Sequence, residues 1–268
     1  MDQPLNPTTN ESVPATSDPS AMPGGPSVPT PVASYIHTFI VIVIMVCVSL
    51  MSAKTMDARR NIPNPPSPAA QYLTTLAWLW LLSALCYIGM RARKIRLIEV
   101  IGGRWKSFDD FLIDIAIAAG FWLTSALCLA GVKFALNHGK ATTLNDLPEA
   151  AKSIAALIPH TPREIALWIA LSITAGLCEE FVFRGYLQRQ FTALTRNAAA
   201  GIALSAMVFG VGHLYQGAQQ VFIIALYGAM FGTLAYFRKS VRPGMMAHAW
   251  QDTLSGLALS LLLPHAGK

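Results

Sequence analysis

Long runs of apolar residues, separated by short polar stretches, make up most of the sequence after residue 35. A run of about 18 or more residues with almost no charge is long enough to cross a hydrocarbon core of about 30 Å as a helix. Seven such runs occur, at about 36–53, 73–90, 111–136, 165–183, 199–216, 219–237 and 245–263. The pattern predicts an all-α fold, a polytopic transmembrane helix bundle of about seven to eight spans.

The same pattern divides the chain into three regions. Residues 1–33 hold eight of the seventeen prolines, many Ser and Thr, and no aromatic residue, so they bury too little apolar surface to offset the entropy of ordering. We expect a disordered N-terminal tail there. Residues 34–164 are predicted to hold the N-terminal transmembrane helices and an interfacial segment from Leu147 to Ile158. Residues 165–268 hold the remaining spans and three polar motifs.

Composition and charge support a membrane protein. Hydrophobic residues make up 53% of the chain and charged residues only 13%, against roughly 25% charged in a typical soluble domain. The net charge of +6 comes from basic clusters between the apolar runs, where cytoplasmic loops are expected to be positive. We therefore expect lipid and no nucleic acid as a partner.

The basic clusters also predict an orientation. The densest one, from Arg91 to Lys106, should face the cytoplasm. Alternation of the spans then places residues 184–196 and 238–242 on the cytoplasmic side as well, and the nearly neutral segment 137–163 on the other side. The four cysteines lie in apolar runs without the spacing of metal ligands.

The first polar motif ends the fourth apolar run and contains Glu179, Glu180 and Arg184. A charge near the centre of a spanning helix costs roughly 2.5–3.5 kcal/mol, so such residues usually face a protein interior. Glu180 and Arg184 are four positions apart and can form an ion pair on one helix face. Glu179 is left free, on a face where Gly176 lets another helix approach. The alternative is a solvated helix end in the interface.

His213 ends the fifth run, in the sequence Phe209-Gly-Val-Gly-His213. The midpoint between positions 179 and 213 is position 196, inside the polar stretch that joins the two runs. A helical hairpin that turns near Arg196 and Asn197 would set Glu179 and His213 at equal depth. A lone histidine near the end of a span is otherwise more often structural.

The third motif opens the seventh run with His248 and Asp252, four positions apart and therefore on one helix face. His248 lies about 9 Å along the helix from Arg242, a depth similar to that of His213. We expect all six polar residues to converge. The alternative is a histidine–aspartate pair that seals the helix end. Gly228 and Gly232 in the sixth run have a spacing that permits close helix packing.

Glu-Glu-x-x-x-Arg, Phe-x-x-x-His and His-x-x-x-Asp, in this order on three apolar helices, resemble the CPBP family of intramembrane glutamic endopeptidases. That family includes the CAAX prenyl endopeptidases and bacterial relatives linked to bacteriocin processing and immunity. The resemblance covers roughly residues 165–264. Its third motif ends in Asn or Asp, and this chain has Asp252. The resemblance implies that residues 165–268 are a catalytic transmembrane domain.

The resemblance also implies roles for the motif residues. Glu179 would be the general base for a water that His213 helps to hold, and the water would attack a peptide carbonyl. His248 and Asp252 would stabilise the developing oxyanion. Asp252 would either be protonated and donate a hydrogen bond, which an apolar pocket with two further carboxyl groups favours, or be ionised and hold His248 as an imidazolium. The Glu180–Arg184 pair would hold its helix in register.

No metal and no cofactor are required by that chemistry. The expected partner is a peptide or membrane-protein substrate, either prenylated or not. The expected location is the bacterial plasma membrane, with a multi-pass chain whose active site opens toward the cytoplasm.

Three alternatives to this function stay open at the level of sequence. A zinc-dependent membrane protease could use two histidines and a glutamate as ligands, although an HExxH motif is absent. A noncatalytic immunity or scaffold protein could keep the fold for binding alone. A small transporter could use the carboxylates as a proton relay.

Overall fold

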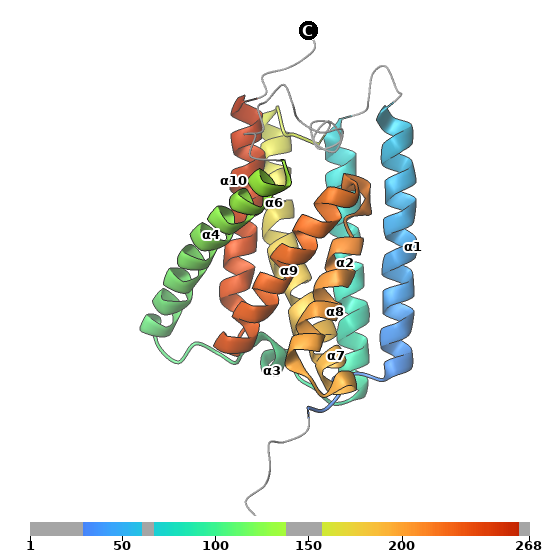
Figure 1. Ribbon diagram of the computed structural model, residues 1–268, viewed down its shortest axis with the longest axis vertical. Helices are drawn as coiled ribbons and strands as arrows, with labels where there is room; N and C mark the ends of the chain where they lie inside the picture. Colours follow the sequence, from blue (N-terminus) through green and yellow to red (C-terminus); the bar gives the residue numbers. More distant parts are fainter. Residues whose placement is uncertain (1–28, 61–66, 138–156, 263–268) are drawn as a thin grey trace, which may run out of the picture.

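The computed structural model describes residues 29–60, 67–137 and 157–262 (Figure 1). Most of the expected disordered tail and most of the expected interfacial segment lie outside these residues. The described residues form an all-α bundle without strands. Its long helices are α1 (Tyr35–Arg60), α2 (Pro68–Ala92), α4 (Phe108–Leu136), α6 (Pro162–Glu179), α8 (Ala198–Val211), α9 (Ala218–Arg238) and α10 (Arg242–Leu262). Each of the seven predicted runs coincides with one of them, which confirms the fold class.

Four short elements complete the described bundle. They are α3 (Leu97–Ile101), the π-helix η2 (Glu180–Leu187), α7 (Gln188–Thr195) and the 3₁₀ helix η3 (Leu214–Gln216). The elements α6, η2 and α7 follow one another without a break, so the helical segment runs from Pro162 to Thr195. The fourth span is therefore longer than the sequence pattern predicts.

Five of the described helical segments are long and apolar enough to cross a membrane, namely α1 up to Met56, α2, α4, the segment 162–195 and α9. The other two predicted spans are not both long and apolar enough to cross a membrane by themselves, each for a different reason. Helix α8 is apolar but only 14 residues long, and α10 has the length but carries His248, Gln251 and Asp252 in its middle. The chain is an integral membrane protein in which these two helices depend on their neighbours for burial.

The helices alternate in direction, so their connections gather at two ends of the bundle. The basic end, at the bottom of Figure 1, holds the connections 93–107, 196–197 and 239–241. The opposite end, at the top, holds the C-terminal ends of α1, α4 and α10 and the N-terminal ends of α2 and α6. The basic connections that the sequence assigned to one face therefore do lie together.

The turn between α7 and α8 is where the spacing argument placed it. Arg196 adopts a left-handed conformation with φ of 54°, and the Asn197 side chain accepts a hydrogen bond from the backbone N–H of Ala200. Asparagine is a favoured N-cap residue because its side chain satisfies an otherwise unpaired helical N–H. The hairpin predicted near Arg196 and Asn197 is confirmed.

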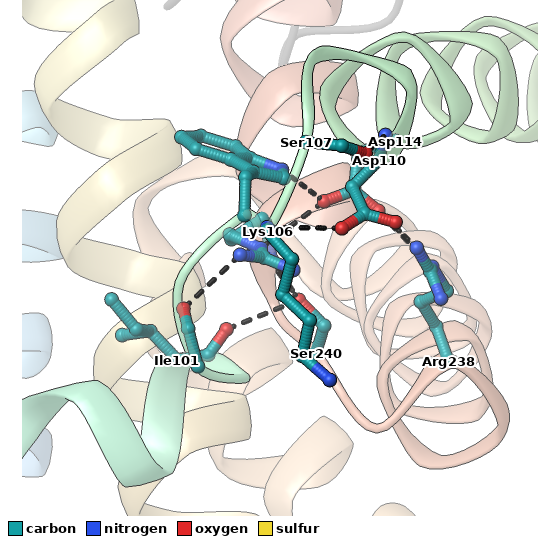
Figure 2. Close-up of polar contacts among 10 residues, drawn as sticks. Ile101, Lys106, Ser107, Asp110, Asp114, Arg238 and Ser240 are labelled. Atoms are coloured by element: carbon teal, nitrogen blue, oxygen red, sulfur yellow. Dashed lines mark hydrogen bonds and ion pairs between the residues drawn. The ribbon is translucent and has the colours of Figure 1, made fainter.

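A buried aspartate ties α4 to the turn between α9 and α10 at the basic end (Figure 2). The Asp114 Oδ1 accepts hydrogen bonds from Arg238 Nε at 3.0 Å and Nη2 at 2.8 Å. Its Oδ2 lies 3.1 Å from Arg242 Nε and accepts a hydrogen bond from Trp105 Nε1 at 2.8 Å. Because a buried carboxylate needs such partners, this contact fixes the start of α10, six residues before His248.

Candidate active site

The Glu180–Arg184 ion pair predicted from sequence lies in the centre of the bundle. Arg184 Nη1 is 2.8 Å from Glu180 Oε1, and both side chains are almost fully buried. Arg184 Nη2 also donates to the Gly228 carbonyl oxygen at 2.9 Å. The guanidinium carbon lies 4.6 Å from the ring centre of Phe209 and 5.0 Å from that of Phe231. Both charges are thus compensated away from solvent.

His248 connects this pair to two further carboxylates. Its Nδ1 lies 3.2 Å from Glu180 Oε1 and donates the hydrogen bond, if the carboxyl group is ionised. Its Nε2 lies 3.8 Å from Glu179 Oε2 and 3.6 Å from Asp252 Oδ2. The ring stacks on Phe231 with centres 5.3 Å apart. His248 is therefore fixed on one side and presents its second nitrogen between Glu179 and Asp252.

His213 follows Gly212, the C-cap residue of α8, and its side chain is held by that helix. Its Nδ1 lies 2.9 Å from the carbonyl oxygen of Phe209, and since a carbonyl only accepts, Nδ1 carries the hydrogen. A neutral His213 then has a lone pair on Nε2 that can accept a hydrogen bond. Among the hydrogen bonds of the described residues, none joins His213 to Glu179. Both side chains line the same cavity.

Four of the six predicted residues line that cavity, which has a volume of about 840 Å³. They are Glu179, His213, His248 and Asp252. The buried ion pair does not line the cavity and lies behind it. The structure therefore brings the six residues together in two layers, with four side chains on the cavity wall and two in support of them.

The adjacent carboxylates Glu179 and Glu180 have opposite environments. The Glu180 side chain is 0% exposed and pairs with a guanidinium, whereas the Glu179 side chain is 15% exposed and borders the cavity. The Glu179 Oε2 atom has no hydrogen-bond partner within the described chain. A carboxylate without a protein donor, beside a cavity, is free to accept a proton from a molecule in that cavity.

Sequence reasoning missed the π-helix and two residues that position α10. All eight residues of η2 are buried, and π-helical turns are frequent at functional sites. Trp168 donates its Nε1 hydrogen to the backbone oxygen of Asp252 at 3.0 Å, so α6 holds α10 beside the site. Asp114 was missed as well, although one acidic residue inside an apolar run is a usable signal.

The close approach of α6 and α10 depends on Gly176. A Cβ atom added at this position would lie 2.6 Å from the Met245 carbonyl oxygen and 2.9 Å from the Ala249 nitrogen. Both atoms belong to the backbone, so the helix itself would have to shift. The small residue predicted on the Glu179 face is confirmed as a point of close helix packing.

We expect Gly176→Ala to lower the free energy of unfolding by about 1–3 kcal/mol, the usual cost of overpacking. Thermal unfolding in detergent measures the change. Gly120→Ala on α4 is the matched control, because a Cβ there meets nothing within 4 Å. A parent-like unfolding temperature for Gly176→Ala, with the control unchanged, would contradict the packing described.

The described residues contain no group of three or more His, Cys, Asp or Glu side chains arranged to hold a metal ion. The cysteines Cys47, Cys86, Cys128 and Cys178 are free thiols on separate helices. A zinc site at Glu179 and the histidines would require these side chains to move from the positions they occupy.

Comparison with known proteins adds one finding. Residues 161–254 match the family model of the Rce1-like type II CAAX prenyl endopeptidases. The match covers about a third of the chain and includes all three motifs. No curated protein and no solved structure matches the chain. The matched part, which carries the six polar residues, is therefore similar to the Rce1-like type II CAAX prenyl endopeptidases.

Proposed function

We propose that the protein is an intramembrane endopeptidase in which Glu179 activates a water molecule for attack on a peptide bond. The family match supports a membrane protease of the CAAX type. The observation that carries the glutamate mechanism is the contrast between the two adjacent carboxylates. Glu180 is neutralised by Arg184 at 2.8 Å and its side chain is 0% exposed, whereas the Glu179 side chain is 15% exposed and lines the cavity.

In the proposed reaction, a water in the cavity gives a proton to Glu179 while its oxygen attacks the carbonyl carbon of the substrate. The unprotonated Nε2 of His213 accepts a hydrogen bond from the other O–H of this water and orients it. The carbonyl π bond breaks and the oxygen becomes an oxyanion. When the tetrahedral intermediate collapses, the C–N bond breaks and Glu179 returns its proton to the leaving amine.

The oxyanion is stabilised by His248 in its imidazolium form. Asp252 Oδ2 lies 3.6 Å from His248 Nε2 and favours the positive charge on the ring. Glu180 accepts from Nδ1 at 3.2 Å and fixes the ring plane. Arg184 in turn holds Glu180, so the buried pair acts on the reaction through the orientation of His248.

The proposed substrate is a polypeptide that reaches the site within the membrane. We also propose the plasma membrane of a bacterium as the location and the basic end as the cytoplasmic side. A prenyl group on the substrate is compatible with the apolar cavity wall formed by Leu79, Leu82 and Leu129, among others.

The experiment that tests this function is cleavage of a peptide library by the purified protein in detergent. Mass spectrometry of the products should show new N-termini and C-termini from internal bonds, because an endopeptidase hydrolyses within the chain. An intact library after incubation with folded protein would favour the noncatalytic immunity or scaffold alternative.

Metal independence follows from the proposed chemistry, since Glu179 generates the nucleophile without an ion to lower the pKa of water. We expect the cleavage rate to be unchanged by a zinc chelator and the purified protein to contain no stoichiometric zinc. Elemental analysis and a rate comparison measure this. Loss of activity in chelator that zinc alone restores would move the assignment to a metalloprotease.

A further inference from the structure

The proposed reaction places a negative charge on the carbonyl oxygen of the substrate, and the six motif residues supply one free donor for it at the cavity wall. That donor is His248 Nε2, which lies 3.8 Å from Glu179 Oε2 and 3.6 Å from Asp252 Oδ2. Both distances are longer than a hydrogen bond, so this N–H is available to a substrate. Asp252 acts in that reaction as a carboxylate, which accepts hydrogen bonds but donates none. Because oxyanion holes usually combine several donors, a second one is expected nearby.

Most hydroxyl groups on the cavity wall already donate to a backbone carbonyl and are not available to a substrate. They belong to Ser49, Thr55, Tyr72, Thr75 and Ser172. Tyr227 also lines the cavity, but its ring packs against those of Phe121 and Phe231, with centres 6.4 and 4.5 Å away. Its hydroxyl faces Ser125 of α4.

Tyr215 differs from these residues because its hydroxyl hydrogen is not used. It lies in η3, two residues after His213, and lines the cavity. Gln216 Nε2 donates to the Tyr215 hydroxyl oxygen at 3.0 Å. The oxygen is the acceptor in that bond, so the hydroxyl hydrogen points elsewhere. Within the described chain this hydrogen meets no acceptor, and it is free for a molecule in the cavity.

The Tyr215 hydroxyl and the His248 N–H border the same part of the cavity. The charged groups that act on the Tyr215 hydroxyl are those of Glu179 and Asp252. The same two carboxyl groups flank His248 Nε2, at 3.8 and 3.6 Å. The Tyr215 ring also lies 6.0 Å from the ring of His213, centre to centre, at an interplanar angle of 33°. One donor from η3 and one from α10 therefore lie beside the proposed base and the residue that orients the water.

We propose that the Tyr215 hydroxyl is a second oxyanion donor and thus a further catalytic residue. This inference rests on the proposed proteolytic function and deepens it. When water adds to the carbonyl carbon, the π electrons move to the oxygen, and Tyr215 donates a hydrogen bond to this oxygen while it keeps its hydrogen. Gln216 is a positioning residue, because its amide fixes the direction of the hydroxyl. A phenol suits a site with three carboxyl groups, since it stays neutral up to a pH of about 10.

Tyr215→Phe tests the donor, because it removes the hydroxyl and keeps the ring. We expect kcat for the best library peptide to fall by about 10²-fold, near the lower end of what one oxyanion donor contributes. KM should stay near the parental value, because the hydrogen bond forms to a charge that exists only in the transition state. Tyr236→Phe on α9 is the matched control, since its side chain is 51% exposed and outside the cavity. Rates are compared per folded molecule after thermal unfolding in detergent.

Gln216→Leu tests the positioning role through its coupling to Tyr215. We expect kcat to fall by about 2–10-fold in the parent, the value of one hydrogen bond. In the Tyr215→Phe background the same change should have no further effect, because the group that Gln216 orients is already absent. Losses that simply add would contradict the positioning role.

Two inhibitors built on the best library peptide separate oxyanion donation from substrate binding. One carries a phosphinate at the scissile position, with a negative oxygen where the oxyanion forms, and the other carries a reduced CH₂–NH bond without that oxygen. We expect Tyr215→Phe to weaken inhibition by the phosphinate by about the same factor as kcat/KM, and to leave inhibition by the reduced peptide unchanged. Equal weakening of both inhibitors, or a rise in KM with parental kcat, would show that Tyr215 only binds substrate and would overturn the proposal.

The failure of this inference and the failure of the proposed function give different results. Parental kcat in Tyr215→Phe, with an active parent, would overturn the role of Tyr215 and leave the protease assignment intact. A peptide library that stays intact with the folded parent would contradict the protease assignment, and the role of Tyr215 would fall with it.

Discussion

Replacing Glu179 with glutamine is expected to lower the rate of peptide cleavage by about 10²–10⁴-fold, the range that a positioned general base contributes. The glutamine keeps the shape of the side chain but cannot take a proton from water. The fold of this variant should persist, because the one ion pair that Glu179 forms among the described residues is the long contact with His248 Nε2, at 3.8 Å. Cleavage of the best library peptide, compared at equal amounts of folded protein, measures the change.

The matched control for this substitution is Glu99→Gln. Glu99 lies on α3 near the basic end and pairs with Arg96 at the surface, so its loss should leave the rate at the parental level. Parental activity in Glu179→Gln would rule out the glutamate as base. A loss in both variants would show that the assay reports general damage to the protein.

Local sequence patterns predicted the elements and contacts that depend on short separations. The Glu180–Arg184 pair follows from a spacing of four in a helix, and it persists although the segment is π-helical. The hairpin turn near Asn197 follows from the position of the polar residues between two apolar runs. Gly176 follows from the need of a second helix to approach the acidic motif. In each case the residues that give the prediction are separated by about one helical turn or one loop.

Contacts between distant segments were not predicted. Asp114 binds Arg238 and Arg242, more than 120 residues later, and the sequence marked these arginines only as a topology signal. His213 was predicted to match Glu179 in depth, and both side chains line the same cavity. The hydrogen bond of His213 to the backbone of Phe209 was not predicted, although carbonyl groups at the C-terminal end of a helix are free to accept one.

The π-helix was also beyond the sequence, because a change of backbone hydrogen bonding leaves no fixed residue signature.

Arg184→Ala is expected to lower the free energy of unfolding by about 3–5 kcal/mol, because it leaves Glu180 as a buried carboxylate without its cation. It also leaves the Gly228 carbonyl without its donor. The cleavage rate should fall in the protein that still folds, since Glu180 orients His248. Thermal unfolding in detergent and the rate per folded molecule measure the two effects separately.

The double variant Glu180→Gln/Arg184→Met is the informative comparison. It removes both charges together, and replacing a buried ion pair with uncharged side chains of similar volume is often nearly neutral for stability. We therefore expect the double variant to unfold at a higher temperature than Arg184→Ala. Cleavage should stay low, because His248 has lost the ionised Glu180 that fixes its ring plane. Arg93→Ala, at the exposed basic end, should match the parent in both measurements. If Arg184→Ala is as stable as the parent, the buried pair does not compensate the Glu180 charge, and the support that it gives to His248 is absent.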